Sequence, residues 1–283
     1  MPRFRTVIGL LGLLFLWANI GQAEASETRR QLAEESTIEL IKKRGVIQVG
    51  VSNFVPWVMR DSKGELIGFE IDIARKLAED INVKLELFPT AFDGIIPGLL
   101  AGKFDIIITG ISIQPLRALL VNYTMPYATS GQTLVGHKEL TKGFSTVEDF
   151  NKPSVTINTR RGTVGAAIAQ KTFPKATVRF FDEDIHAFQD VLNGHAHAMV
   201  ALEPIPTQWL TANPDKLWRP IGTKKLTTQI AGMAVRKGDP DFLAFLNSWI
   251  ALKQADGWLD ERHNYWFGTN AWYGLVEKPP TVK

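Results

Sequence analysis

The chain has 283 residues, of which 45% are hydrophobic and 22% charged, and its formal net charge is +3. This balance is typical of a soluble globular protein, and the length suits one large domain or two lobes. Because Arg3 and Arg5 supply part of the positive charge and the other basic runs are short, the sequence does not predict a nucleic-acid-binding surface.

The N-terminus has the pattern of a secretory signal. Arg3 and Arg5 precede an apolar stretch over residues 7–20, and the small residues Ala23 and Ala25 follow it. The stretch is short for a membrane-spanning helix, which needs about 20 residues, so the pattern favours cleavage after Ala23 or Ala25 over an uncleaved signal anchor. We therefore predict a signal peptide over residues 1–25.

The chain contains no Cys. It can therefore form no disulfide, and it cannot be anchored as a lipoprotein through an N-terminal Cys. Together with the signal, this predicts a free protein of the periplasm of a double-membraned bacterium.

Apolar spacing in the first half of the chain predicts alternating strands and helices. The predicted helices cover residues 29–44, 71–81 and 95–101, and the predicted strands cover 46–49, 83–88 and 104–109. This order predicts a parallel sheet covered by helices. Glu70 and Asp72 are expected to be charges at a helix N-terminus and not site groups.

A second α/β series follows from about residue 132. The predicted strands cover residues 133–135, 154–157, 178–181, 196–201 and 230–235, and the predicted helices cover 163–171, 185–192, 206–210, 241–254 and 258–265. The fold class is therefore α/β, with two similar halves.

A short polar segment, Gly110-Ile-Ser-Ile-Gln-Pro-Leu-Arg117, directly follows the strand predicted over residues 104–109. A guanidinium just beyond a buried strand suits a carboxylate, because its rigid fork can donate two charge-assisted hydrogen bonds. Considered alone, a Ser and an Arg at a strand end would more commonly be turn and surface residues.

This segment resembles the Gly-x-[Ser/Thr]-Ile-x-Pro-x-Arg signature of the periplasmic amino-acid-binding proteins of ABC transporters, that is, the bacterial extracellular solute-binding proteins of family 3. The resemblance extends over residues 36–268. It is carried by further segments in the family's order, namely Arg44–Val51, Pro56-Trp57, Gly64–Ala74, Ala91–Leu99, Gly102–Asp105, Met125–Tyr127 and Gln254–Gly257.

The resemblance implies a two-lobed type II periplasmic binding protein fold, in which two crossover strands join the lobes and the ligand is enclosed in the cleft. Residues 26–130 and 228–283 would form lobe 1, and residues 131–227 would form lobe 2. The crossovers would lie near residues 132–135 and 227–231. Closure about a hinge around the ligand is a known mode for such proteins.

For lobe 1, the resemblance implies that Arg117 clamps the α-carboxylate of the ligand. The backbone carbonyl of Gly110 and the hydroxyl and N–H of Ser112 would contact the α-amino and carboxylate groups. Phe92 and Phe54 would be aromatic walls of the cleft, although Phe92 could instead belong to the core of the lobe. Trp57 could serve as either wall or core.

For lobe 2, the resemblance implies that Thr163 contacts the carboxylate at a helix start, where free N–H groups suit an anion. Arg160 either reads the ligand side chain or is an exposed residue. The segment Gly194–Glu203 resembles a family block whose final Asp binds the α-ammonium, but Leu202 falls on that position. We expect the adjacent Glu203 to replace the Asp. If the contact is missing, the ligand could be a carboxylic acid without a free α-amine.

The leading hypothesis for function is a non-enzymatic receptor that captures an amino acid or related small carboxylate and delivers it to the permease of an ABC importer. No motif indicates a metal or cofactor, and a monomer is expected. The absence of an acidic cluster on the first cleft loop does not favour arginine or lysine as ligand. The alternatives are a cyclohexadienyl dehydratase-like enzyme, with Glu203 as general acid, and a sensory module that docks on a membrane receptor.

Overall fold

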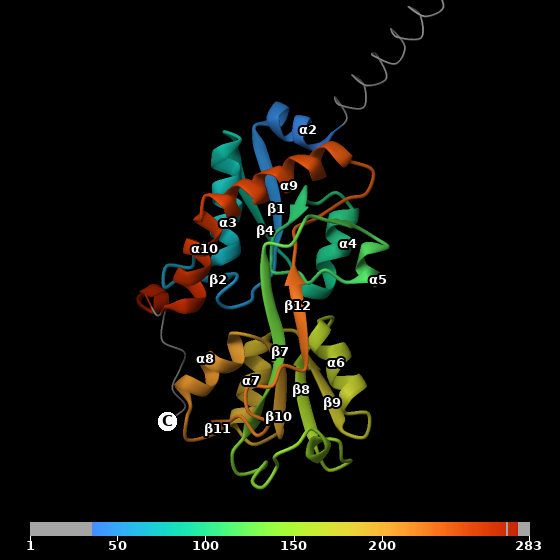
Figure 1. Cartoon of the computed structure of the whole chain (residues 1–283), viewed down its shortest axis with the longest axis vertical. Coiled ribbons are helices and arrows are strands. Elements are labelled where there is room, and N and C mark those ends of the chain that lie inside the picture. Colours follow the sequence, from blue (N-terminus) through green and yellow to red (C-terminus); the bar gives the residue numbers. More distant parts are fainter. Residues whose placement is uncertain (1–35, 270, 277–283) are drawn as a thin grey trace, which may run out of the picture.

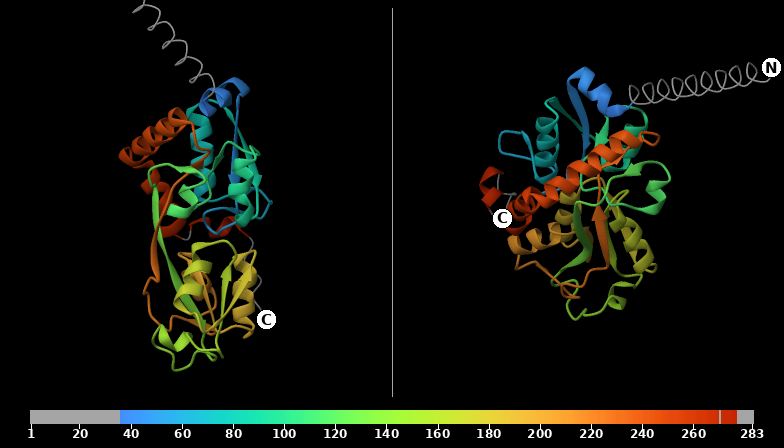
Figure 2. Two further views of the ribbon diagram at one scale, coloured as in Figure 1. Left: turned by 90° about the vertical axis from the view of Figure 1, so that its right-hand side faces the viewer. Right: turned by 45° about the horizontal axis from the view of Figure 1, so that its top comes forward.

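The computed structural model describes residues 36–269 and 271–276, so the predicted signal peptide lies outside the described residues. Two β-sheets, each flanked by helices, form two lobes stacked along the long axis of the molecule (Figure 1). The further views in Figure 2 show the same two bodies, joined by long strands. The prediction of a two-lobed α/β fold is confirmed.

Lobe 1 contains a five-stranded sheet in the order β4-β1-β5-β13-β6. Strand β1 is parallel to β4 and β5, whereas β13 is antiparallel to β5 and β6. The sheet is therefore mixed, because its fourth strand returns from the C-terminal part of the chain. The strands are β1 (Val46–Val51), β4 (Lys84–Pro89), β5 (Ile106–Ile107), β6 (Asn122–Tyr123) and β13 (Ala234–Val235).

Helices and a small hairpin surround this sheet. The hairpin pairs β2 (Met59–Arg60) with β3 (Leu66–Ile67). The helices are α2 (Thr37–Arg44), α3 (Phe69–Asp80), α4 (Ile95–Leu100), α5 (Pro115–Ala118), α9 (Pro240–Ala255) and α10 (Trp258–His263), with 3-10 turns η1 (Phe92–Gly94) and η4 (Ala271–Leu275) and a π-helical turn η3 (Asn264–Gly268).

The apolar pattern of the sequence accounts for the core of lobe 1. The β1 side chains Ile47 and Val49 are fully buried, as are Ile73 and Leu77 on the inner face of α3. Their spacing, two residues apart in the strand and four in the helix, places each pair on one face of its element. These faces meet in one cluster that also includes residues of α9 and α10, so both ends of the described chain contribute to lobe 1.

Lobe 2 contains a sheet in the order β11-β7-β10-β8-β9, and β12 pairs with β7 beside this path. Its strands β10, β8 and β9 are parallel, with β9 at the edge of the sheet. The elements are β8 (Thr156–Arg160), β9 (Thr177–Phe181), β10 (Ala198–Leu202), β11 (Leu217–Trp218), α6 (Val164–Thr172), α7 (Asp184–Leu192), α8 (Ile205–Ala212) and the 3-10 turn η2 (Glu148–Phe150).

Strands β7 (Ala128–His137) and β12 (Thr227–Ala231) run side by side between the lobes (Figure 1). They are antiparallel, with Ala128 opposite Ala231 and Gln132 opposite Thr227. The single strand predicted over residues 230–235 is therefore two strands, β12 and β13. The predicted lobe boundaries at residues 130/131 and 227/228 fall within the β7–β12 pair, and they stay a prediction.

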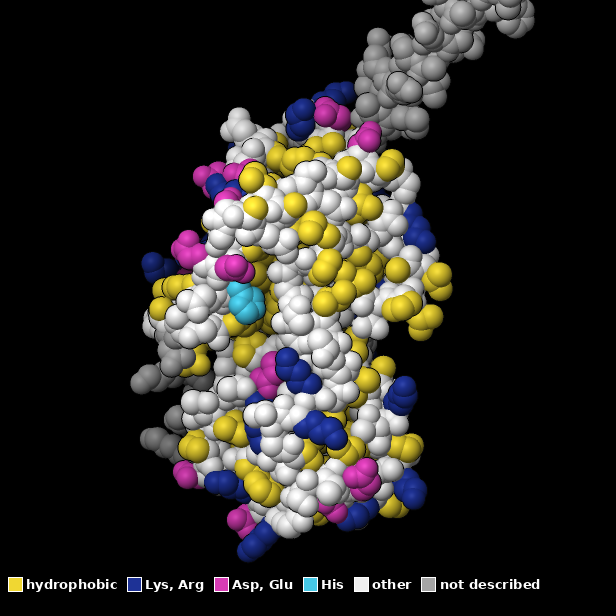
Figure 3. All heavy atoms as spheres, viewed as in Figure 1, with side chains coloured by type: hydrophobic (Ala, Val, Ile, Leu, Met, Phe, Trp, Pro, Cys, Tyr) yellow, Lys and Arg dark blue, Asp and Glu magenta, His cyan; other side chains and the backbone are white. Residues whose placement is uncertain are grey.

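Two observations concern the distribution of surface charge and the apolarity of the helices. On the face shown in Figure 3, basic and acidic side chains are interspersed and do not gather into one stripe. None of the helices within the described part of the chain is long and apolar enough to cross a bilayer.

Candidate functional site

The loops after four parallel strands meet where the two lobes face each other. Ser52 follows β1 and the Gly110 loop follows β5 in lobe 1, while Arg160 ends β8 and Asp182 follows β9 in lobe 2. Because the carboxyl ends of parallel strands lie at the same edge of a sheet, each lobe presents one loop-rich edge, the usual place for a ligand in open α/β sheets.

A pocket lies between these edges and is lined by both lobes. Its space is about 410 Å³, including the part open to solvent. The lining residues are Phe54, Phe92, Gly110, Ser112, Arg117, Gln132, Arg160, Thr163, Val164, Asp184, Val200, Ala201, Leu202 and Gln229. The pocket thus brings together all the predicted ligand-binding residues except Glu203.

Arg117 lies on α5, a short helix that the sequence did not predict. Its Nη1 donates to the carbonyl oxygen of Ser112 (3.2 Å), and its Nη2 donates to that of Gly162 in lobe 2 (3.0 Å). Burial lowers the pKa of Arg117, and no carboxylate in the described part of the chain forms an ion pair with it. Arg117 is therefore a desolvated cation that has neutral partners and further donors to offer.

The loop before Arg117 is supported from below by buried residues. Gly110 has a φ of 63°, and a Cβ there would lie 3.0 Å from the Trp57 ring, so a larger residue would be strained and crowded. Beneath it, the fully buried Glu70 accepts a hydrogen bond from Tyr127 (2.7 Å). Burial raises the pKa of Glu70 to about 8. Glu70 is therefore neutral at pH 7 and supports the site loop, a role that its place at a helix start did not reveal.

Gln132 and Gln229 line the pocket from the crossover strands β7 and β12. Ser112 donates its hydroxyl hydrogen to Gln229 Oε1. Both glutamines are buried, and Gln132 Oε1 and Gln229 Nε2 have no hydrogen-bond partner among the described residues. Neither glutamine was predicted from the sequence as a site residue. A glutamine within an otherwise buried strand was the only sequence feature that could have pointed to each of them.

Thr163 is the N-cap of α6. Its Oγ1 accepts from the N–H of Ala166 (3.2 Å) and donates to the carbonyl oxygen of Arg160 (2.7 Å). The first N–H groups of a helix have no partner within it, and here they lie next to Gly162, which Arg117 contacts. A helix start and a guanidinium thus converge from opposite lobes, an arrangement that suits an anion.

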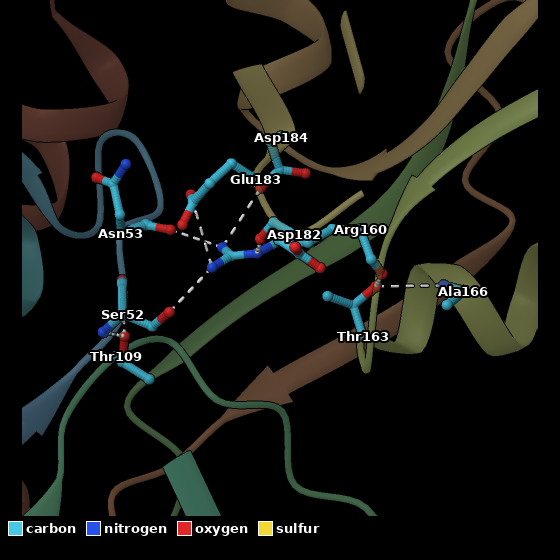
Figure 4. A network of polar contacts seen from close by, with 9 residues as sticks. All are labelled: Ser52, Asn53, Thr109, Arg160, Thr163, Ala166, Asp182, Glu183 and Asp184. Carbon is cyan, nitrogen blue, oxygen red and sulfur yellow. Dashed lines mark hydrogen bonds and ion pairs between the residues drawn. The ribbon is translucent and has the colours of Figure 1, made fainter. Parts of the chain in front are cut away.

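Arg160 reaches across the cleft from lobe 2 and is only 2% exposed. Its guanidinium lies between the loop after β1 and the loop after β9 (Figure 4). It donates to the carbonyl oxygen of Asn53 (2.6 Å), to Ser52 Oγ (2.9 Å) and, through Nε, to the carbonyl oxygen of Asp182 (3.1 Å). Of the two alternatives for Arg160, the exposed side chain is wrong, because Arg160 is a buried link between the lobes. It also lines the pocket, and its contact with the ligand stays a prediction.

Phe92 and Phe54 form the aromatic part of the lining. The Phe92 ring centroid is 5.4 Å from the guanidinium carbons of both Arg117 and Arg160, so both cations contact the ring. Phe54 stacks on Trp57 with the rings 6.2 Å apart. Trp57 is itself buried in the core of lobe 1.

Asp184, the first residue of α7, also lines the pocket and was not among the predicted site residues. Its Oδ2 lies 3.5 Å from Arg160 Nη1 and has no hydrogen-bond partner among the described residues. Burial raises the pKa of Asp184 to about 6, although the charge of Arg160 opposes this rise.

Glu203 does not line the pocket, whereas Leu202 does. The Glu203 carboxylate accepts hydrogen bonds from Thr133 (2.6 Å), Thr207 (2.7 Å) and Arg219 (2.6 Å). Burial alone would raise the pKa of Glu203, but these bonds hold it below its ordinary value. Glu203 is thus an ionised and well-paired group, without the raised pKa that a general acid would need.

Within the described ranges, no group of three or more His, Cys, Asp or Glu side chains is placed to hold a metal ion.

Two α/β lobes, a pair of crossover strands and an interlobe pocket define the class of periplasmic binding proteins. The chain belongs to the bacterial extracellular solute-binding proteins, family 3, whose model matches residues 47–269.

Individual relatives are consistent with this family. The chain is 27% identical over 242 residues to the L-cystine-binding protein TcyJ of Escherichia coli (strain K12), covering 85% of this chain and 90% of TcyJ. A solved structure of a putative ABC-transporter binding component from Wolinella succinogenes, complexed with lysine, is 38% identical with a TM-score of 0.77, covering 82% of this chain and 99% of that one.

An enzyme is also among the relatives. The chain is 25% identical over 272 residues to the cyclohexadienyl dehydratase of Pseudomonas aeruginosa (strain PAO1), covering 94% of this chain and 96% of the enzyme. The family and the more similar transport proteins nevertheless place the chain among the binding proteins of ABC transporters and not among the enzymes.

Proposed function

We propose that this protein is a periplasmic receptor that captures an amino acid or a related small carboxylate between its lobes and delivers it to the permease of an ABC importer. The observation that carries the proposal is Arg117, a half-buried cation without a carboxylate partner in the described chain, beside the start of α6 in a pocket shared by both lobes.

A carboxylate in this pocket would bind to both lobes at once. One part would accept hydrogen bonds from Arg117 on lobe 1, and another from the free N–H groups at the start of α6, which Thr163 caps, on lobe 2. Ser112 and Gly110 would contact the ligand beside the guanidinium, and Phe92 and Phe54 would form its apolar walls. Glu203, which the sequence favoured as an ammonium partner, is not part of the proposed site.

Closure of the cleft would follow from this shared binding. A ligand that contacts both lobes stabilises the closed form more than the open one, and a differential affinity of a few kcal/mol suffices to change which form predominates. The permease would recognise the closed form. The proposal includes export by a signal peptide over residues 1–25, a monomeric state, and the lobe boundaries predicted above.

The names of the relatives support a ligand of the amino-acid class, because one relative is a cystine-binding protein and another is complexed with lysine. The dehydratase alternative loses its proposed acid, because the Glu203 carboxylate is paired with Arg219 and lies outside the pocket lining.

A thermal-shift screen of the mature protein against amino acids, hydroxy acids, oxo acids and dicarboxylates tests the proposal. A ligand that binds only the folded state raises the melting temperature. We expect at least one carboxylate to do so, and we expect Arg117→Ala to abolish the shift while the control Arg161→Ala retains it. Arg161 is exposed, pairs with Asp182 and does not line the pocket. A panel without any shift, or a shift that persists in Arg117→Ala, would contradict the proposal.

A further inference from the structure

The charged residues that line the pocket are unbalanced. They are Arg117, Arg160 and Asp184. Asp184 faces Arg160 at 3.5 Å, and Arg160 also lies 3.8 Å from Glu183 behind the lining. The acidic groups of this region therefore lie at ion-pair distance from Arg160 and not from Arg117, which is left as an excess positive charge. An occupant with a net negative charge complements such a lining.

The end of β10 gives the pocket an apolar wall. Val200, Ala201 and Leu202 line the cavity there, and the next residue, Glu203, is held outside it by its own three partners. A ligand ammonium against this wall would be desolvated without a free carboxylate to pair with, which is unfavourable.

Besides Asp184 Oδ2, which faces Arg160, the buried polar atoms of the lining that lack hydrogen-bond partners among the described residues are neutral. Gln229 Nε2 is a buried donor and Gln132 Oε1 a buried acceptor, both without a partner among the described residues. A carbonyl or hydroxyl oxygen of a ligand can accept a hydrogen bond from the first, and a hydroxyl group can donate one to the second. Buried groups of this kind favour a ligand that completes their hydrogen bonds.

The geometry points to a ligand that is a small carboxylic acid bearing an oxo or hydroxyl group where an amino acid bears its ammonium. This inference rests on the proposed function and narrows it: Arg117 binds the carboxylate, the crossover glutamines bind the neutral oxygen, and Leu202 excludes the charged amine. Arg160 lies beside Asp184 and Glu183 and balances their negative charge. A cationic side chain of the ligand would therefore have to compete with Arg160 for these carboxylates.

The competing arrangement keeps the amino acid. In it, Asp184 would leave Arg160 and pair with the ligand ammonium, and Arg160 would retain Glu183 and the carbonyl oxygen of Asn53. The two arrangements predict opposite changes in binding affinity when the ammonium of an amino acid is replaced by an oxo or hydroxyl group on the same carbon skeleton.

Titration calorimetry of the wild-type mature protein with matched acids tests the inference. The probes are alanine, lactate and pyruvate; leucine, its 2-hydroxy acid and its 2-oxo acid; and glutamate, 2-hydroxyglutarate and 2-oxoglutarate. We expect that in at least one set an oxygen-bearing acid binds at least tenfold more tightly than the amino acid, and that no amino acid binds more tightly than its oxygen analogues.

Two opposite results separate this inference from the proposed function. If an amino acid binds at least tenfold more tightly than its analogues and Arg117→Ala removes this binding, the receptor proposal stands and the inference is overturned. If no acid of either kind binds, both are contradicted.

Substitutions at the apolar wall provide a second, independent measurement. Leu202→Asp places a carboxylate beside the ligand, so we expect it to raise the affinity ratio of amino acid to oxo acid by at least tenfold. The matched control Leu202→Asn has the same shape without the charge and should leave the ratio within threefold of the wild type. Equal ratios in the two variants would show that this wall does not face the ligand ammonium position and would count against the inference.

Discussion

Glu70 shows how a single side chain connects the core to the site. It is fully buried beneath Gly110, accepts a hydrogen bond from Tyr127, and has a pKa raised by burial to about 8 from an ordinary value of 4.5. Between these two pH values the unfolded chain releases this proton and the folded chain retains it. Folding stability therefore falls as pH rises from about 4.5 to 8, and this contribution levels off above pH 8.

Glu70→Gln should remove this pH dependence, because the amide has nearly the same shape and cannot ionise. We expect the free energy of unfolding of the wild type to lose on the order of 3 kcal/mol relative to the variant between pH 5 and pH 8. Urea unfolding at several pH values measures the difference. Glu79→Gln on the exposed side of α3 is the control and should retain the wild-type slope. A variant slope equal to that of the wild type would mean that Glu70 is ionised in the fold.

At the scale of single residues, the resemblance of short segments to family motifs predicted four site residues, and the structure brings them into one pocket, namely Arg117, Ser112, Phe92 and Thr163. It did not predict Asp184, whose Asp-Glu-Asp context resembles an ordinary helix start. Glu203 was favoured from its position in the chain alone. Only the fold shows that Thr133, Thr207 and Arg219 surround it.

At the scale of elements, helix α9 depends on Asp239, which precedes it. The Asp239 carboxylate accepts from the N–H of Phe242 (2.9 Å), the N–H of Thr37 (2.6 Å) and the hydroxyl of Ser36 (2.8 Å). Burial opposes ionisation, but these bonds hold the pKa of Asp239 below its ordinary value. One carboxylate thus caps α9 and ties it to the start of α2.

Asp239→Ala should destabilise the protein by about 1–2 kcal/mol at pH 7, the usual cost of losing an N-cap. Because a lowered folded-state pKa stabilises only above the unfolded value, the difference should shrink as pH falls below about 4. Chemical unfolding at pH 7 and pH 3 checks this. Asp241→Ala, an exposed change in the first turn of the same helix, should cost less than about 0.5 kcal/mol. A loss in Asp239→Ala no greater than in this control would contradict the capping role.

Most elements follow from apolar periodicity, and the exceptions have physical reasons. The strand predicted over residues 104–109 is paired only at Ile106–Ile107, because the chain then turns at Gly110 into the site. The strand predicted over 230–235 splits at Gly232, where a Cβ would lie 3.0 Å from Ile113. The four-residue helix α5 is too short for any periodicity to reveal, although it carries Arg117.

At the scale of the whole molecule, the two lobes contact each other at the site through side chains that the ligand would also engage. Arg160 donates from lobe 2 to Ser52 and Asn53, and Arg117 donates from lobe 1 to Gly162. The discontinuous make-up of lobe 1 could be predicted only through family resemblance, because no local sequence pattern shows that β13 and α9 return to the first sheet. The long-range pairing of β13 with β5 and β6 specifies that return.

The most direct test of the central claim, capture of a carboxylate between the lobes by Arg117, is titration calorimetry of the best ligand with the wild type, Arg117→Ala and Arg161→Ala. Removing the partner of a desolvated carboxylate costs about 2–5 kcal/mol, which corresponds to an affinity loss of roughly 30- to 5000-fold. We expect this loss in Arg117→Ala and an affinity close to the wild type in Arg161→Ala. An affinity of Arg117→Ala within twofold of the wild type would contradict the claim.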